Sequence, residues 1–328
     1  MRKIYTLTMS LLVCIGALAG NNGTIGDNLQ WSFADGTLTI SGKGEMQHAE
    51  GNSVYAWGGE NPQVNRNDIK KVVVQEGVTS LAEYICWDFA NLQEVTLPKS
   101  LTKLGKQCFK LCTALKSITL PDDITLIEES AFDGCSALET VTFPKNLKEV
   151  SEKAFYSCKL KKVDLSQTQV ETIGMGAFAH NEQCKEVYLP KTLKIFEGED
   201  EGAFSSCGVK KAVCSAVEPP KTIVGGYNLI TLEKNTDPVT WINIFEGSDE
   251  DFVLEVPAGS VENYKNADGW KNAASHITTG IRGVKAAQAK VGVYDITGKR
   301  YMNHADAQTV STLQHGVYII NGKKVLVK

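Results

Sequence analysis

Histidine and proline are scarce in this sequence, and basic residues do not outnumber acidic ones. Its 328 residues include 5 His and 9 Pro, and 34 Lys and Arg stand against 38 Asp and Glu, a formal net charge of −4. So few prolines exclude a collagen-like fibre, and the slightly acidic balance argues against a dedicated nucleic-acid-binding protein. The apolar share of 42% is too high for a disordered chain. A folded protein that does not bind nucleic acid is therefore expected.

Sequence motifs of catalysis are also missing. The chain has no G-x-S-x-G, no H-E-x-x-H and no P-loop. It has no C-x-x-C and no mixed Cys and His spacing of the kind that holds zinc. We therefore expect no enzyme, no catalytic residue, no metal site and no cofactor. A glycosidase's pair of carboxylates stays open as an alternative, because that geometry is tertiary. The histidines are scattered, at His48, His180, His276, His304 and His315.

Two acidic clusters could supply oxygen ligands to a hard cation. They are Glu197–Glu201 and Asp249–Asp251. Neither has the alternating ligand spacing of a dedicated calcium loop. We therefore interpret both clusters as solvated loops.

The amino terminus has the features of an export signal. Met1–Lys3 is basic, Ile4–Ala19 is mostly apolar, and the run ends in the small-x-small pattern Ala17–Ala19. The run is too short for a membrane span, and Cys14 does not follow a small residue, which disfavours a lipid anchor. We predict a cleaved signal peptide over residues 1–19 and a protein that is extracellular or on the outer cell surface. No other stretch predicts a transmembrane segment.

A repeat of about 23 residues organises the middle of the chain, and a period of this length is typical of a solenoid. Position one of each copy is apolar, as are positions four and six, which predicts a short strand with one buried face. Pro98, Pro121, Pro144 and Pro190 end such strands. One copy cannot bury its own apolar face, so the copies must stack. The copies are Ile69–Asn91, Leu92–Ala114, Leu115–Ala137, Leu138–Lys159, Leu160–Gln183 and Cys184–Gly208, and a degenerate copy starts at Val209.

The cysteines follow the same repeat. One repeat position holds Cys112, Cys135, Cys158 and Cys207, and Asn181 occupies it in the copy Leu160–Gln183. An exchange of Cys and Asn at a fixed position is typical of a buried small polar group that bonds to neighbouring backbone. Parallel side-chain directions disfavour disulfides between stacked copies. The cysteines are therefore predicted to be buried thiols.

These copies resemble the bacterial leucine-rich repeats named after the BspA surface antigen. The shared pattern is an L-x-x-I-x-L-P stem followed by I-x-x-x-A-F-x-x-C, seen here in Ile127–Cys135 and in Val150–Cys158. In Ile69–Asn91, Cys86 and Phe89 take the Phe and Cys positions in reversed order. The resemblance implies a solenoid that is rich in β-strand with short helical turns. It also implies a non-enzymatic surface protein that attaches to host matrix proteins or to other cells.

The flanks complete the predicted domain organisation. Asn28–Gly42 reads as a hairpin around Asp35-Gly36, and it resembles the amino-terminal cap of these proteins, with Trp31 and Trp57 closing the core. Phe252–Trp270 resembles their terminal repeat, and the last residues resemble the sorting module of secreted Bacteroidetes proteins. The predicted units are a signal peptide over 1–19, a β cap over 20–68 and leucine-rich repeats over 69–215. A degenerate repeat with a carboxy-terminal cap follows over 216–279, and a small β module ends the chain over 280–328.

The outward strand face is the candidate binding site, because solenoids commonly bind partners along such a ladder. Repeat positions two and three hold eight Lys against three Glu, which favours an anionic partner. An extracellular or host protein is the expected partner. A glycan is the alternative, although Tyr188 is the only aromatic residue on this face. A strand face that binds no partner is equally compatible with the sequence. The sequence does not specify the oligomeric state. The candidate residues are Lys71, Glu94, Thr96, Thr119, Thr142, Lys162, Asp164, Glu186, Tyr188 and Lys211.

Overall fold

The computed structural model describes most of the chain between residues 21 and 279. The described ranges are 21–25, 27–47, 55–57, 63–198, 201–223 and 243–279, together with strand segments at 293–295, 300–302, 316–320 and 323–327. The predicted signal peptide lies outside these residues. No helix among them is long and apolar enough to cross a membrane.

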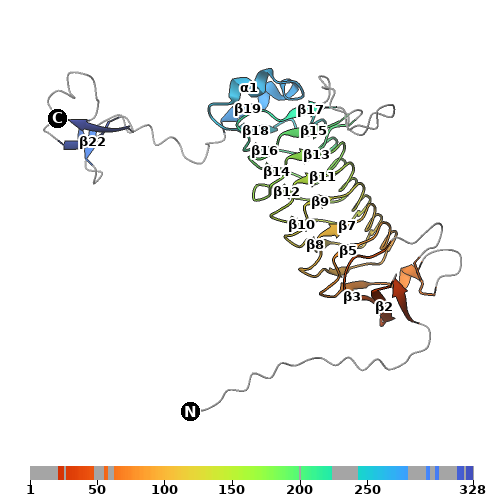
Figure 1. The fold of residues 1–328 in the computed structure, drawn as a ribbon. Helices are drawn as coiled ribbons and strands as arrows, with labels where there is room; N and C mark the ends of the chain where they lie inside the picture. Colours follow the sequence, from red (N-terminus) through yellow and green to blue (C-terminus); the bar gives the residue numbers. More distant parts are fainter. Residues whose placement is uncertain are drawn as a thin grey trace, which may run out of the picture.

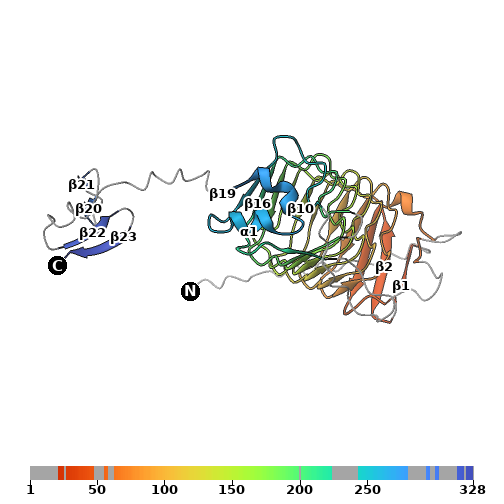
Figure 2. The same ribbon diagram turned by 90° about the horizontal axis from the view of Figure 1, so that it is seen from above.

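The predicted fold class is confirmed: the chain forms a β-solenoid of about 8 turns with little helix (Figures 1 and 2). Each coil contributes one strand to a parallel ladder that we call the stem ladder. Alternation turns positions four and six of the repeat toward the core and positions three and five outward, and positions four and six are buried in most coils. The stem strands are β4 (Lys71–Val74), β6 (Glu94–Thr96), β8 (Ser117–Thr119), β10 (Thr140–Thr142), β12 (Lys162–Asp164), β14 (Glu186–Leu189), β16 (Lys211–Cys214), β18 (Val253–Val256) and β19 (Ile277–Thr279).

A second ladder of short strands follows the proline turns. After it, each coil makes a tight turn in which one Phe is buried, and the rings of successive coils stack with centroids 5.0 to 5.4 Å apart from Phe109 to Phe245. The two ladders and this ring stack enclose one continuous apolar core. The second strands are β5 (Ser80–Leu81), β7 (Lys103–Leu104), β9 (Leu126–Ile127), β11 (Glu149–Val150), β13 (Thr172–Ile173), β15 (Ile195–Glu197) and β17 (Lys221–Ile223).

The eight cysteines of the described residues are buried and free. At the shared repeat position, Cys135 Sγ donates to the Phe109 carbonyl oxygen at 3.1 Å, and Cys158 Sγ donates to that of Phe132 at 3.2 Å. In the copy that has Asn181 at this position, Asn181 Nδ2 donates to the Phe155 carbonyl oxygen at 2.9 Å. The position therefore supplies a hydrogen bond to the coil before it. Burial raises the pKa of the Cys207 thiol to about 12, so it stays protonated at neutral pH.

The predicted hairpin cap is present. Strands β2 (Leu29–Ala34) and β3 (Thr37–Gly42) pair around Asp35 and Gly36, both at positive φ, as a tight hairpin turn requires. A further strand, β1 (Asn22–Ile25), pairs with β2, and β3 continues the stem ladder in parallel with β4. Trp57 packs edge-on against both Trp31 and Phe89, and its Nε1 donates to the Ile85 carbonyl at 2.7 Å. The tryptophans therefore cover the first coil.

The solenoid extends beyond the regular sequence period. Strand β17 and Phe245 belong to a seventh coil, and β18 pairs with β16 although about forty residues separate them in sequence. Short helices α1 (Val261–Asn266) and η2 (Lys271–His276) then cover the end (Figure 2). Tyr264 and Trp270 are buried there and donate to the carbonyls of Ala216 and Pro220 at 2.8 and 2.7 Å. These two bonds fix the end cap to the preceding coil.

The small carboxy-terminal β module is also confirmed as a separate antiparallel sheet. Its strands are β20 (Val293–Asp295), β21 (Arg300–Met302), β22 (Gly316–Ile320) and β23 (Lys323–Val327), in the order β21-β20-β22-β23. All four strands lie within residues 280–328, where the sequence predicts this module.

Candidate binding face

All ten candidate residues lie on stem strands and point outward at positions three or five. Strand pairing makes neighbours of Lys71 and Glu94, and of Thr119 and Thr142. It also aligns Lys162, Glu186 and Lys211 in one row and places Asp164 beside Tyr188. Thr96 ends the first block of the ladder, because no β-pairing joins β6 to β8. We call this surface the stem face.

Ion pairs occupy the carboxy-terminal part of the stem face. Lys162 Nζ lies 2.9 Å from Asp164 and 4.4 Å from the centre of the Tyr188 ring, and the Tyr188 hydroxyl donates to Glu186 at 3.0 Å. The hydrogen bond to Asp164 raises the pKa of Lys162. Lys211 pairs with Glu255 at 3.1 Å. These side chains satisfy one another rather than presenting free charge.

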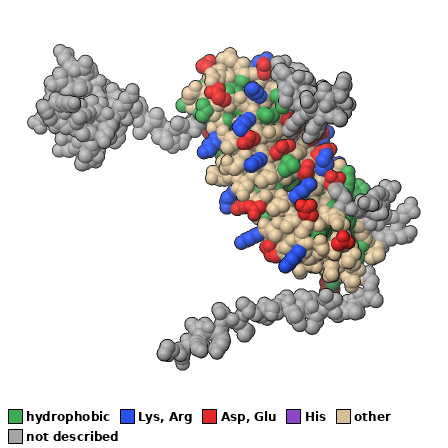
Figure 3. Space-filling model, in the orientation of Figure 1, with side chains coloured by type: hydrophobic (Ala, Val, Ile, Leu, Met, Phe, Trp, Pro, Cys, Tyr) green, Lys and Arg blue, Asp and Glu red, His purple; other side chains and the backbone are tan. Residues whose placement is uncertain are grey.

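The expected lysine-rich stripe is largely neutralised by such pairs. Lys71 pairs with Glu94 at 2.7 Å, Lys161 with Glu139 at 2.6 Å and Lys210 with Asp249 at 3.4 Å. With the pairs of Lys162 and Lys211, five of the eight lysines counted in the sequence contact an acidic group. Figure 3 shows basic and acidic side chains interspersed along the viewed side of the stack. The sequence count therefore overstated the attraction for an anionic partner, because it ignored acids in neighbouring coils.

The centre of the stem face is uncharged. Thr96, Thr119 and Thr142 are exposed at position five of three successive coils. Ser117 and Thr140 are exposed beside them at position three. This hydroxyl-bearing surface lies between the ion pair of Lys71 and the ion pairs that begin at Lys161.

A groove of about 590 Å³ opens at this uncharged centre, between β6 and β8. We call it the stem groove. Its floor includes Val95, Leu97 and Leu120, and the three position-five threonines line it. Lys99, Asp122 and Asp123 form its charged rim. Sequence reasoning missed Val95 and Leu97 as surface residues, because the period assigns them to the core. The structure leaves both partly exposed.

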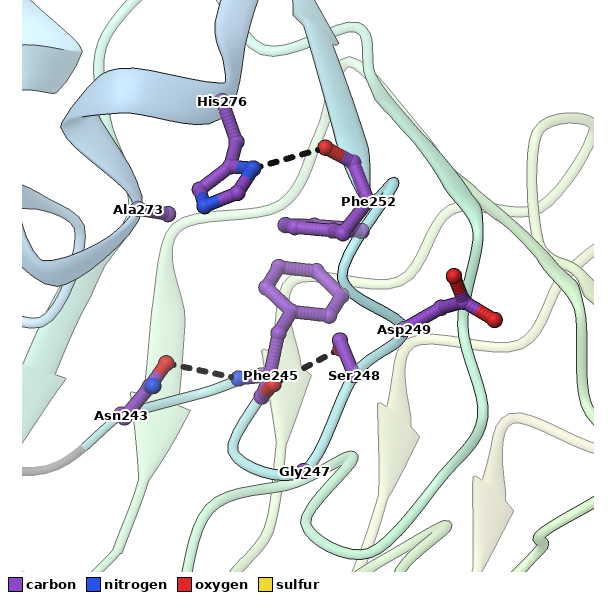
Figure 4. Close-up of a pocket in the computed structure, with 8 residues that line it drawn as sticks. All are labelled: Asn243, Phe245, Gly247, Ser248, Asp249, Phe252, Ala273 and His276. Atoms are coloured by element: carbon purple, nitrogen blue, oxygen red, sulfur yellow. Dashed lines mark hydrogen bonds between the residues drawn. The ribbon is translucent and has the colours of Figure 1, made fainter.

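A smaller cavity of about 160 Å³ lies near the carboxy-terminal cap (Figure 4). Its polar groups are engaged in local turns: Ser248 Oγ donates to the Phe245 carbonyl at 2.7 Å, and Asn243 Oδ1 accepts from the Phe245 amide at 3.1 Å. His276 Nδ1 lies 2.9 Å from the Phe252 carbonyl. Ser248 therefore directs its hydroxyl to the backbone rather than to His276, and this cavity has no nucleophile and base pair.

The acidic clusters do not form a cation site among the described residues, where no group of three His, Cys, Asp or Glu side chains is placed to hold a metal ion. Glu197 is buried within β15, so its interpretation as part of a solvated loop is wrong. Glu201 lies 3.0 Å from His180 Nε2, and Asp249 pairs with Lys210. Strand β15 extends further than the acidic composition suggested.

Two exposed aromatic residues were also missed. Tyr84 and Trp87 lie on the tight turn of the first coil, 49% and 38% exposed. The Arg66 guanidinium lies 5.1 Å from the Trp87 ring centre and 3.5 Å from Asp88. Later copies have Lys110 and Asp133 at the repeat position of Trp87. Charged residues at this position indicate that it is exposed, so the sequence could have predicted an exposed Trp87. These rings lie on the tight turn and not on the stem face, so the protein has an exposed aromatic surface separate from Tyr188.

Together, the stacked parallel ladders and the outward stem face define a leucine-rich-repeat solenoid. Residues 64–132 and 106–218 match the family described as BspA type leucine rich repeat region, in 6 copies. The matched repeats span residues 64–218, and this part of the chain is similar to that family. No curated protein sequence matches the chain.

Solved structures of bacterial leucine-rich-repeat proteins are similar to this chain. A leucine rich repeat protein of T. pallidum is 24% identical over 58% of this chain and 86% of its own, with a TM-score of 0.40. One from Bacteroides ovatus is 18% identical over 72% and 70%, with a TM-score of 0.34. A leucine rich cell surface protein of Faecalibacterium prausnitzii is 14% identical over 80% and 95%, with a TM-score of 0.34.

Proposed function

We propose that this protein is an exported, non-enzymatic binding protein of the cell surface. It attaches to extracellular matrix proteins of a host, or to proteins of other cells, through the stem face. The observation that carries the proposal is the uncharged threonine surface with its groove, set between ion-paired flanks. An exposed surface with a partly apolar floor gains more from burial against a protein than a fully solvated face does.

Binding of the purified chain to immobilised fibronectin, laminin and collagen tests this proposal. Thr142→Arg places a long charged side chain on the stem face, and Thr125→Arg makes the same change in the neighbouring coil, at an exposed site beside the second ladder. We expect Thr142→Arg to weaken binding by at least about tenfold and Thr125→Arg to leave it unchanged. Absence of binding to every protein tested, or equal loss in both variants, contradicts the proposal.

The response of binding to salt distinguishes this proposal from the hypothesis that a lysine-rich strand face attracts an anionic partner. Because most stem-face lysines are already paired, affinity should change by less than about threefold between about 50 and about 500 mM NaCl. A steep loss of affinity with salt would restore the anionic-partner hypothesis.

Glycan binding is a second candidate function, which the exposed Trp87 and Tyr84 favour. Aromatic faces stack on apolar sugar faces, and the adjacent Arg66 and Asp88 offer hydrogen bonds to hydroxyls. A glycan array probed with the wild-type chain and with Trp87→Ala tests it. Loss of glycan binding in Trp87→Ala supports this function, and an array without any binding rejects it.

The terminal segments are proposed to deliver the protein to the surface. Residues 1–19 act as the signal peptide, and residues 280–328 act as a sorting module. Fractionation of cells that express the full chain, and of cells that express it without residues 280–328, tests the second role. Equal surface levels for both would reject it.

A further inference from the structure

One junction between coils lacks the strand pairing that joins its neighbours. Strand β6 pairs with β4 but not with β8, and β7 pairs with β5 but not with β9. Within the continuous described range 63–198, this is the only junction at which both ladders are interrupted. β10 and β12 are also unpaired, but β11 and β13 still pair there.

The two coils are held together at their tight turns. Backbone amides of Gln107, Phe109 and Leu111 donate to the next coil at 3.0, 2.9 and 2.8 Å. The Phe109 and Phe132 rings stack at 5.4 Å, and Lys106 pairs with Glu129 at 2.9 Å. The junction is therefore closed along one edge and open on the stem face.

The open side leaves two apolar repeat positions partly exposed, as the unpaired β10 and β12 junction does with Val141 and Phe143. Val95 and Leu97 are partly exposed, whereas Val72 and Val74, at the same positions of the preceding coil, are buried. At the unpaired junction of β10 and β12, the Phe143 ring packs edge-on against Phe155 and Phe178 across the junction, with centroids 5.5 and 6.2 Å apart. Leu97 is the matching residue at the first junction, and it is too small to do the same. The stem groove remains there.

We propose that the stem groove binds an extended segment of a partner protein, which inserts one aliphatic side chain between β6 and β8. This inference deepens the proposed function and rests on its choice of the stem face. The facing edges of β6 and β8 are not paired with each other, but the two strands remain adjacent, so the groove admits a side chain and not an inserted strand. The apolar floor fits an aliphatic side chain, while Lys99 and Asp123 on the rim suit a segment with charges of both signs; Asp122 is already paired with Lys145 at 3.0 Å.

The composition of the groove favours a polypeptide over a sugar. Its lining contains no aromatic side chain for a sugar ring to stack on. Its volume of about 590 Å³ lies within the range of about 300–1,000 Å³ typical of ligand sites. A peptide side chain with its flanking backbone fills such a space.

Random linear peptides displayed on phage and selected against the full chain provide the probe. The tightest peptide is synthesised and titrated by fluorescence anisotropy against wild type, Thr96→Arg on the groove, and Thr125→Arg at an exposed site beside the second ladder, outside the lining residues. We expect Thr96→Arg to weaken binding by about tenfold or more and Thr125→Arg by less than about twofold. Replacing the peptide's aliphatic residue by Asp should weaken binding equally.

Hydrogen exchange gives a readout that needs no variant. The bound peptide should slow exchange at residues 95–97 and 117–121 of the wild-type chain and leave β14 unchanged. Failure to select a peptide, equal binding to Thr96→Arg, or protection elsewhere overturns the proposal. If matrix proteins bind but the peptides do not depend on Thr96, only the groove is rejected. If the peptides bind the groove and no matrix protein binds, only the proposed function fails.

Discussion

Asn181 permits a quantitative test of how the coils are joined. In neighbouring copies, the first residue of a coil lies three residues after the shared Cys, and its amide donates to that Cys carbonyl, as Leu115 does to Cys112 and Leu138 to Cys135. The copy Leu138–Lys159 is one residue shorter, so Leu160 follows Cys158 by two. The Leu160 amide instead donates to Asn181 Oδ1 of the next coil at 2.9 Å. Asn181 therefore compensates for a one-residue deletion.

The expected cost of removing this side chain follows from its bonds. Asn181 is fully buried, and its Nδ2 also donates to the carbonyls of Phe155 and Phe178, at 2.9 and 2.8 Å. The Phe178 carbonyl keeps a second donor, Cys207 Sγ. Asn181→Ala thus leaves two buried backbone groups, Phe155 C=O and Leu160 N–H, without this partner. At about 1–3 kcal/mol for each group, the variant should lose about 3 kcal/mol of unfolding free energy.

Asn181→Cys separates the two contributions. A thiol can donate to Phe155 as in the other coils but is only a weak acceptor for the Leu160 amide, so we expect a loss of about 1–2 kcal/mol. Inserting one Ser after Cys158 restores the usual spacing and should return Asn181→Cys to within about 0.5 kcal/mol of the insertion alone. Urea unfolding followed by tryptophan fluorescence measures stability, and hydrogen exchange of the Leu160 amide gives the local readout. The reasoning is refuted if Asn181→Cys costs as much as Asn181→Ala, or if the insertion does not recover it.

The remaining predictions concern the thiols and the close contacts between coils. The eight cysteines of residues 20–328 should resist a thiol reagent at about pH 8 in the native chain and all react after denaturation, because all eight are buried away from the reagent and burial also raises the pKa of thiols such as Cys207. Rapid labelling of the folded chain would contradict this. Burial raises the pKa of Cys184 and Cys214 to about 11, so above the unfolded value of about 8.5 the unfolded state loses protons first and stability falls, by up to about 2 kcal/mol per thiol at about pH 10. Stability that is unchanged between neutral pH and about pH 10 would reject this linkage. Gly174→Ala should cost about 2 kcal/mol of unfolding free energy, because its Cβ would lie 2.5 Å from the Glu152 amide nitrogen. Gly259→Ala is the control, because its Cβ would have nothing within 4 Å, and it should change stability by less than about 0.5 kcal/mol. Equal melting temperatures of the two variants would contradict the close approach at Gly174.

Much of the fold was predictable because the repeat is local. The apolar positions, the prolines after each stem strand and the recurring Ala-Phe pair each reflect contacts that every coil makes with the next. The hairpin at Asp35-Gly36 was equally accessible, since two adjacent residues at positive φ specify the turn. The seventh and eighth coils were harder to recognise, because a long segment separates β17 from Phe245 and hides the period.

The candidate face was only partly predictable. Alternation placed Thr119, Thr142 and Tyr188 outward, and the structure agrees. The pairing of Lys211 with Glu255 was not predictable, because Glu255 belongs to a coil whose register the sequence does not reveal. The exposure of Val95 depends on whether β6 meets β8, which no single copy specifies.

The solenoid, its β-rich coils and the burial of its cysteines could be predicted from the sequence, because each depends on a pattern that recurs in every coil, and the amino-terminal hairpin could be predicted because its turn is local. How charges cancel across the stem face and where the ladder opens became evident in the folded structure. These properties arise between coils, from the spacing of strands that are about 23 residues apart in the chain. The stem groove exists because one junction is held at its turns and not at its strands.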